Sequence, residues 1–138
     1  MRTVLVVEDS FLESYELEYS LRELGYTVAI AATLETAEQR FRGLYGDLAA
    51  IVCDNKLLRG EPIGARFYAH VRSRQPSLPF VVYSGFPPQD LPKDDPLLAI
   101  VRKPFMDDVI KHLRRFNSIL DKTPRRTVLP IKSDREAA

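Results

Sequence analysis

The sequence is poor in the residues that form disulfides and soft-metal sites. Its 138 residues include one cysteine, Cys53, and two histidines, His70 and His112. A single cysteine excludes an internal disulfide and leaves no cysteine-based zinc site, and two histidines exclude a histidine-rich metal site. We expect Cys53 to be a small buried residue of a strand and both histidines to face solvent from helices.

Other features are also missing. No apolar run approaches the ~20 residues of a membrane-spanning helix, and the apolar run after the N-terminus is too short for a signal peptide. Lys and Arg number 20 against 19 Asp and Glu, a net charge of +1, whereas a protein that binds nucleic acid by charge is more basic. The absence of a glycine-rich loop after the first run excludes a P-loop or dinucleotide enzyme. We therefore expect a cytoplasmic protein of one domain.

Five short apolar runs predict strands. They are Thr3–Val7, Thr27–Ala32, Ala49–Cys53, Pro79–Tyr83 and Leu98–Arg102. Because the runs are continuous and largely β-branched, they are typical of strands buried on both faces of a parallel sheet. Segments with helical spacing lie between them. Ser10, followed three residues later by Glu13, predicts a capping box at the first helix.

Three more helices are predicted by their first residues. Thr33 caps the second helix, Pro62 opens the third, and the last begins at about Asp107. The alternation predicts an α/β fold, a (βα)5 doubly wound sheet of five parallel strands. The four prolines of 86–96 predict a fourth helix that is short, distorted or missing. We expect one domain over residues 1–121 and a flexible or partner-ordered tail over 122–138.

Polar side chains follow four of the five predicted strands. They are Glu8 and Asp9, then Asp54, then Ser84, then Lys103. Ligands of doubly wound sheets bind at the carboxyl ends of the strands, so we expect these groups to converge. Two carboxylates ~4 Å apart repel by ~4 kcal/mol at an effective dielectric of ~20, which calls for a cation. Mg²⁺ suits such oxygen ligands, and a carboxylate, a metal, a lysine and a hydroxyl together suit phosphoryl transfer.

Four segments carry a family resemblance. VLVVEDS (4–10), IVCDNKL (51–57, with Gly60 and Gly64 following), VVYSG (81–85) and VRKPF (101–105) occur in the order and spacing of one family. Over roughly residues 2–121 the chain resembles a response-regulator receiver domain of two-component signalling, of the stand-alone single-domain type. The resemblance implies the flavodoxin-like strand order 2-1-3-4-5.

The resemblance also implies roles for the converging residues. Asp54 would be the phosphoacceptor, Ser84 would turn towards the phosphoryl group, and Lys103 would pair with its oxygens. The implied Mg²⁺ ligands are Glu8, Asp9, Asp54 and the backbone carbonyl of Lys56. The Lys103–Pro104 peptide would be cis. The donor would be the phosphohistidine of a sensor histidine kinase or a histidine phosphotransfer protein.

Three positions depart from the family pattern. Ile100 stands where the family often has a switch aromatic, and Leu58 stands where it has a proline. Phe86 occupies the position two residues after the hydroxyl residue. In the family, this side chain and the one at Lys56 flank the hydrolytic water. A bulky Phe86 is expected to exclude that water, so we predict slow self-dephosphorylation.

The leading functional hypothesis is a phosphoacceptor that signals by protein–protein contact. It would catalyse only its own phosphotransfer and slow autodephosphorylation, would have no DNA-binding domain of its own, and could form a homodimer. The alternative is a non-phosphorylated receiver-like protein-binding module, which Ile100 and the proline-rich 86–97 segment favour. A small phosphohydrolase with an aspartate nucleophile is disfavoured, because such enzymes usually carry a second Asp where Lys56 stands.

Overall fold

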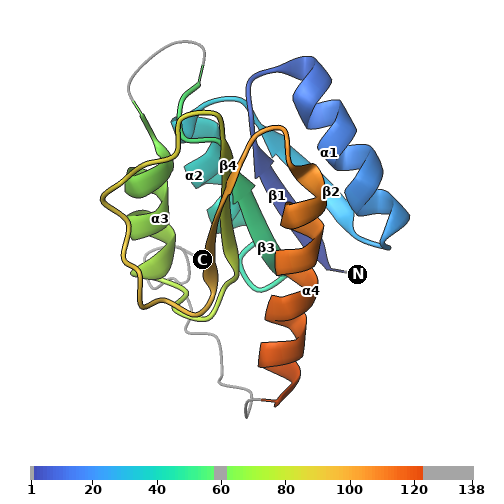
Figure 1. Ribbon diagram of the computed structural model, residues 1–138, viewed down its shortest axis with the longest axis vertical. Helices are drawn as coiled ribbons and strands as arrows, with labels where there is room; N and C mark the ends of the chain where they lie inside the picture. Colours follow the sequence, from blue (N-terminus) through green and yellow to red (C-terminus); the bar gives the residue numbers. More distant parts are fainter. Residues whose placement is uncertain (1, 58–61, 123–138) are drawn as a thin grey trace.

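The chain folds into one parallel sheet with helices on both faces (Figure 1). The computed structural model describes residues 2–57 and 62–122. In chain order the elements are β1 (Thr3–Val7), α1 (Phe11–Glu23), β2 (Thr27–Ala31), α2 (Leu34–Gly43), β3 (Leu48–Cys53), α3 (Gly64–Arg72), β4 (Phe80–Ser84), β5 (Leu98–Arg102) and α4 (Met106–Lys122). The sheet order is β2-β1-β3-β4-β5 and all neighbouring pairs are parallel. The predicted fold class and strand order are therefore confirmed.

The sheet separates two apolar layers. Val6 of β1 faces the layer that contains Leu21 of α1 and Phe116 of α4. The next residue, Val7, faces the opposite layer, which contains Phe41 of α2. Successive strand side chains point to opposite faces, so a central strand covered on both faces must be apolar at every position. This explains the continuous apolar runs. None of the helices in the described ranges is long and apolar enough to cross a membrane.

The helix starts follow local side-chain chemistry. Ser10 Oγ accepts a hydrogen bond from the Glu13 N–H at 3.4 Å, and Thr33 Oγ1 accepts one from Thr36 N–H at 3.1 Å. Only half of the predicted capping box forms, because the Ser10 N–H donates to Glu8 Oε2 at 3.1 Å. The Glu13 side chain is thereby left to reach another partner.

No helix forms between β4 and β5, where residues 85–97 run as bends and turns. The predicted fourth helix is thus missing, and α4 corresponds to the predicted fifth. Prolines remove backbone donors and clash with the preceding turn, so this stretch cannot complete helical hydrogen bonding. Leu91 nevertheless lies in the core and anchors the middle of the segment.

A polar cluster fastens the end of this segment to α3. Asp95 Oδ2 accepts hydrogen bonds from Arg72 Nε at 2.8 Å and from the Tyr68 hydroxyl at 2.5 Å, and Asp95 Oδ1 accepts one from the Leu97 N–H at 2.9 Å. Arg72 Nη1 also donates to the carbonyl of Leu78 at 2.6 Å. Charge-assisted bonds of this kind are stronger than neutral ones, so the cluster anchors the end of this segment to α3.

The environment of His70 differs from the prediction. Its ring stacks on Phe67 at 6.3 Å between centroids and meets Phe41 edge-on at 5.8 Å, and its Nε2 atom is buried. The expectation of a solvated side chain was wrong, because His70 lies three residues beyond Phe67 on the inward side of α3. Burial is the main cause that lowers the pKa of His70. His112 is half-buried against Phe116 rather than solvated.

The predicted domain boundary lies close to the end of α4 at Lys122. The remainder of the predicted tail, residues 123–138, lies outside the described residues, as do Leu58 and Gly60. Cys53 is fully buried in the core, as expected.

Candidate functional site

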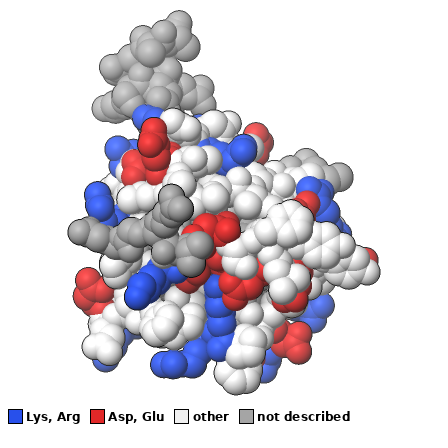
Figure 2. Space-filling model, turned by 90° about the horizontal axis from the view of Figure 1, so that it is seen from above, with Lys and Arg blue, Asp and Glu red and all other residues white. Residues whose placement is uncertain are grey.

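The carboxyl ends of the strands lie at the upper edge of the sheet in Figure 1, and polar residues end or follow four of them. Parallel strands end at the same edge, and β1 and β3 are neighbours at its centre. Glu8 and Asp9 follow β1, Asp54 follows β3, Ser84 ends β4, and Lys103 follows β5. Figure 2 looks down on this edge and shows acidic side chains close to its centre, with basic side chains beside them. The convergence inferred from strand order is therefore present.

Three carboxylates form a compact cluster. Glu8, Asp9 and Asp54 each offer an oxygen within 4.8 Å of the others. Glu8 and Asp54 are buried and Asp9 is half-buried. Burial raises the pKa of Glu8, although the hydrogen bond from Lys103 opposes that rise. Gathering negative charge away from water is unfavourable, so the cluster requires a cation close by.

Lys103 supplies one positive charge to this cluster. Its Nζ donates to Glu8 Oε1 at 2.5 Å and to Asp54 Oδ2 at 3.1 Å. Burial alone would lower the pKa of Lys103, but the hydrogen bond and charge of Glu8 and the charge of Asp54 outweigh burial and raise it. The ammonium is therefore charged at neutral pH. The Lys103–Pro104 peptide is cis, as the resemblance implied.

Lys56 lies two residues after Asp54 in the chain, and Ser84 ends β4, which is the neighbour of β3 in the sheet. The buried Ser84 Oγ accepts a hydrogen bond from the Phe86 N–H at 3.1 Å, which uses a lone pair and not the hydroxyl proton. The Lys56 N–H donates to Asp54 Oδ1 at 3.3 Å. The role of the Lys56 carbonyl as a metal ligand stays a prediction, as does the inward turn of Ser84.

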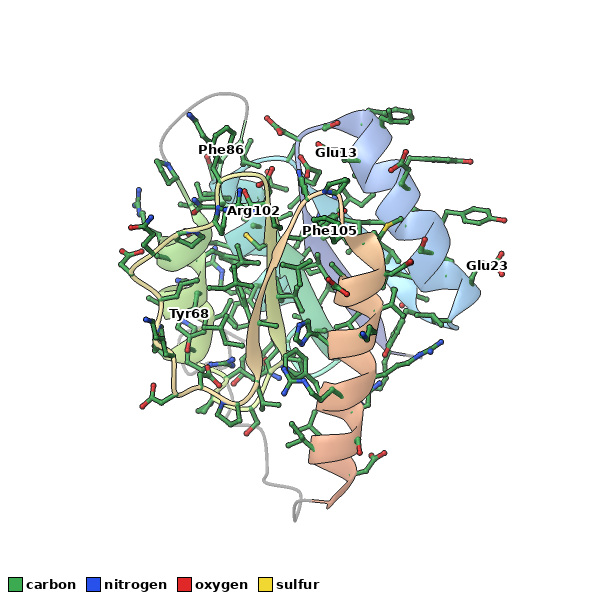
Figure 3. The ribbon with its side chains drawn as sticks, viewed as in Figure 1. Glu13, Glu23, Tyr68, Phe86, Arg102 and Phe105 are labelled. Carbon is green, nitrogen blue, oxygen red and sulfur yellow. The ribbon has the colours of Figure 1, made fainter. Side chains whose placement is uncertain are left out.

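The side chains of Phe86 and Lys56 contact each other near Asp54. The Lys56 ammonium lies 5.2 Å from the centre of the Phe86 ring, within the range of a cation–π interaction. The Phe86 side chain is 69% exposed and stands at the upper edge of the molecule (Figure 3). The two side chains predicted to flank the site are thus in contact with each other.

Sequence reasoning missed Asn55. This buried side chain donates from Nδ2 to the Phe86 carbonyl at 2.6 Å and accepts from the Gly64 N–H at 3.0 Å. A Cβ at Gly64 would lie 2.7 Å from Asn55 Oδ1, so the glycine permits this close approach. Asn55 ties together the segments that follow β3 and β4, and nothing in its local sequence distinguishes it from an ordinary loop residue.

A second missed residue is Glu13 on the first turn of α1. The sequence suggested only a capping role, yet Glu13 Oε1 forms an ion pair with Lys103 Nζ at 3.2 Å. Figure 3 shows Glu13 at the same upper edge of the molecule. A contact across 90 positions of the chain leaves no local signal in the sequence.

The donor set fits a hard divalent cation. All three clustered groups are carboxylates whose oxygens approach within 4.8 Å, and Mg²⁺ and Ca²⁺ favour oxygen ligands. The cluster is thus compatible with metal binding. Chemically, the site combines a carboxylate at the end of a central strand with an ammonium 3.1 Å away, which suits reactions that place negative charge on oxygen.

No family model matches the sequence, and no curated protein matches it. Solved structures do match. A response regulator receiver protein from Sinorhizobium medicae WSM419 has a TM-score of 0.72 at 19% identity, over 85% of this chain and 94% of that one. A response regulator receiver domain protein from Clostridium thermocellum has a TM-score of 0.73 at 16% identity, over 88% and 98%.

A third match was solved with a bound group. The response regulator TrrA from Thermotoga maritima, in complex with Mg²⁺–BeF, has a TM-score of 0.70 at 19% identity, over 84% of this chain and 99% of that one. The matches span nearly the whole of these domains, and the strand order agrees with the one predicted. The chain therefore has the flavodoxin-like fold of response-regulator receiver domains.

Proposed function

We propose that this chain is a phosphoacceptor response regulator that takes a phosphoryl group onto Asp54. The observation that carries the proposal is the shared ammonium of Lys103, which contacts two members of the carboxylate cluster, Glu8 and Asp54. A strand-end carboxylate with a neighbouring ammonium is equipped to attack phosphorus and to stabilise the charge on the oxygens.

The proposed step is a substitution at phosphorus. An Asp54 carboxylate oxygen forms a bond to phosphorus while the bond from phosphorus to the donor breaks, and the leaving group takes the electron pair. With a phosphohistidine donor, the leaving imidazole takes a proton from solvent. Lys103 neutralises charge on the phosphoryl oxygens, and the Ser84 hydroxyl proton, which the Phe86 contact does not use, donates to one of them.

Mg²⁺ is the metal we propose for the acidic cluster. Glu8, Asp9 and Asp54 would hold it with the Lys56 carbonyl, and it would supply further neutralisation of phosphoryl charge. The residues of the chain have their own part in this chemistry. They place a carboxylate, an ammonium and a hydroxyl at one edge of a rigid sheet, which removes the entropy cost of assembling them.

We expect the phosphoryl donor to be a sensor histidine kinase or a histidine phosphotransfer protein in the cytoplasm. The phosphoryl group of an aspartyl phosphate carries about −1.5 to −2 charges, whereas the free Asp54 carboxylate carries only a single negative charge, so phosphorylation makes the site more negative. Such a change can bias loops tied to the site, and Asn55 ties the segment after β4 to the loop after β3. The output would then be a change in protein–protein contact.

A second candidate is a receiver-like module that binds a protein without phosphorylation. Two observations favour it. Residues 85–97 form no helix, and Ile100 replaces the switch aromatic with an aliphatic side chain that is 44% exposed on β5. In this case the carboxylates and Lys103 would stabilise the edge of the sheet and take no phosphoryl group.

Acetyl phosphate with Mg²⁺, followed by intact mass measurement, separates the two candidates. We expect the wild-type chain to gain about 80 Da, and Asp54→Ala to gain nothing. Asp94→Ala, which changes an exposed aspartate, should behave as wild type. An unmodified wild-type chain, or an adduct that survives Asp54→Ala, would contradict the proposed phosphoacceptor and favour the binding module.

A further inference from the structure

Lys103 has a third carboxylate partner that lies outside the acidic cluster. Its Nζ lies 3.2 Å from Glu13 Oε1 on α1, in addition to its hydrogen bonds with Glu8 and Asp54. An ammonium group has three N–H donors. The three carboxylates therefore match the donors of Lys103 in number before any phosphoryl group arrives.

We propose that Glu13 is a positioning residue, which holds the Lys103 ammonium in the resting protein and gives it up to the phosphoryl group on Asp54. This inference rests on the proposed phosphoacceptor function. It adds a counterion that must be exchanged during phosphorylation, and it assigns that part to a residue on α1.

Glu13 is the partner that can leave at the lowest cost. Its side chain is 42% exposed, whereas those of Glu8 and Asp54 are 3% and 8% exposed. A carboxylate that is already near water regains hydration when it separates from the ammonium, but a buried one would lose its partner without replacement. Glu13 also offers no oxygen to the cluster of Glu8, Asp9 and Asp54, so the metal ligands are unaffected by its movement.

Glu13 should slow phosphorylation in two ways. It competes with the phosphoryl oxygens for Lys103, and its negative charge repels the incoming anion at the mouth of the site. Glu13→Gln removes the negative charge and so weakens both effects. The variant should therefore be phosphorylated faster than wild type. An exposed ion pair is typically worth up to about 1 kcal/mol, which corresponds to a rate increase of up to about fivefold. The acceleration should shrink as salt screens the repulsion.

The first test uses the metal-free protein without any phosphodonor. Wild type, Glu13→Gln and Glu16→Gln are treated with a limiting amount of N-hydroxysuccinimidyl acetate, and acetylation of Lys103 is measured by peptide mass spectrometry. Glu16 is exposed on the same helix, and the ion pairs of Lys103 within the described residues do not include it. We expect Glu13→Gln to raise the reactivity of Lys103 by up to about fivefold, and Glu16→Gln to leave it unchanged.

The second test compares initial rates of phosphorylation by acetyl phosphate and Mg²⁺ at low and high ionic strength. We expect Glu13→Gln to exceed both wild type and Glu16→Gln at low salt, with a smaller excess at high salt. The Ser10 cap depends on the backbone N–H of residue 13, so Gln preserves it, and urea unfolding of the three proteins should confirm similar folding.

The outcomes separate this inference from the function on which it rests. If wild type gains the adduct but Glu13→Gln matches wild type in rate and in Lys103 reactivity, the exchange of Glu13 is overturned and the phosphoacceptor function stands. If wild type gains no adduct, both the function and the exchange are overturned. A faster Glu13→Gln with a more reactive Lys103 supports the exchange.

Discussion

Replacing Asp95 should reveal what holds the segment between β4 and β5, which forms no helix, in place. Asp95→Ala removes the acceptor for Arg72 Nε, the Tyr68 hydroxyl and the Leu97 N–H. The side chains of Asp95 and Arg72 are only 13% and 16% exposed, so water replaces these contacts poorly. The perturbation therefore removes hydrogen bonds and also leaves a half-buried charge without its counterion.

The expected loss follows from these contacts. Two neutral donors each lose about 1 kcal/mol. Breaking a fully buried ion pair costs about 3–5 kcal/mol, but Arg72 keeps its hydrogen bonds to the carbonyls of Gln75 and Leu78. If those bonds reduce the cost of the broken ion pair to about 1 kcal/mol, the free energy of unfolding should fall by about 3 kcal/mol in total. Urea unfolding followed by far-UV circular dichroism measures this difference.

Asp94→Ala provides the matched control, because the neighbouring aspartate is exposed. Its free energy of unfolding should stay within about 0.5 kcal/mol of wild type. If Asp95→Ala is no less stable than Asp94→Ala, the polar cluster does not hold the segment and our reasoning fails.

The same variant has a pH signature. Burial acts to raise the pKa of Asp95, but the hydrogen bonds from Tyr68 and the Leu97 N–H and the charge of Arg72 together lower it. A lowered carboxyl pKa stabilises the fold above the ordinary value of about 4, and that stabilisation is lost as the pH falls through the folded-state pKa. The stability difference between wild type and Asp95→Ala should therefore shrink below about pH 4. A difference that stays constant in acid would argue against the ionic contribution.

Three further outcomes follow from other contacts. Gly64→Ala places a Cβ 2.7 Å from Asn55 Oδ1 and should lower the free energy of unfolding by about 1–3 kcal/mol in urea titrations; an unchanged midpoint would contradict the close approach. Burial and nearby Arg74 lower the pKa of His70, so wild type should lose more stability than His70→Gln between about pH 7.5 and about pH 5.5; equal losses would refute this. Phe86→Ala should shorten the lifetime of the aspartyl phosphate, measured by intact mass, and a longer lifetime would show that Phe86 does not exclude water.

The strands and caps could be predicted because their causes are local. The apolar runs agree with the observed strands to within one residue at each end. Ser10 and Thr33 cap the helices assigned to them through hydrogen bonds that span three residues. The prolines of 86–96 act on their own backbone, so the absence of a helix there is also visible in the sequence.

The site could be predicted in part for a different reason. Strand order brings the residues after β1, β3, β4 and β5 to one edge, so Asp9, Asp54 and Lys103 converge without knowledge of any side-chain contact. The contacts between Glu13 and Lys103 and between Asn55 and Phe86 depend on side-chain reach across distant segments. Such contacts leave no periodicity or spacing in the sequence, so only the folded structure reveals them.

His70 shows where pattern reasoning could have gone further. The apolar stripe of α3 contains Phe67 and Val71, and His70 lies next to this stripe on the helical wheel. A position three residues after an inward Phe is expected to be at least half-buried. Its partial burial beside Phe67 was therefore available from spacing alone, whereas its contact with Phe41 of α2 was not.

The segment between β4 and β5 contacts the rest of the fold at Phe86, Leu91 and Asp95. Residues 92–94, which lie between Leu91 and Asp95, are exposed. Residues inserted at 92–94 would extend into solvent without moving Leu91 or Asp95, since the entropy cost of closing a loop rises only slowly with its length. Evolution could therefore vary the length of this stretch, and an epitope or a fluorescent reporter could be inserted into it, while the carboxylates at the sheet edge keep their places.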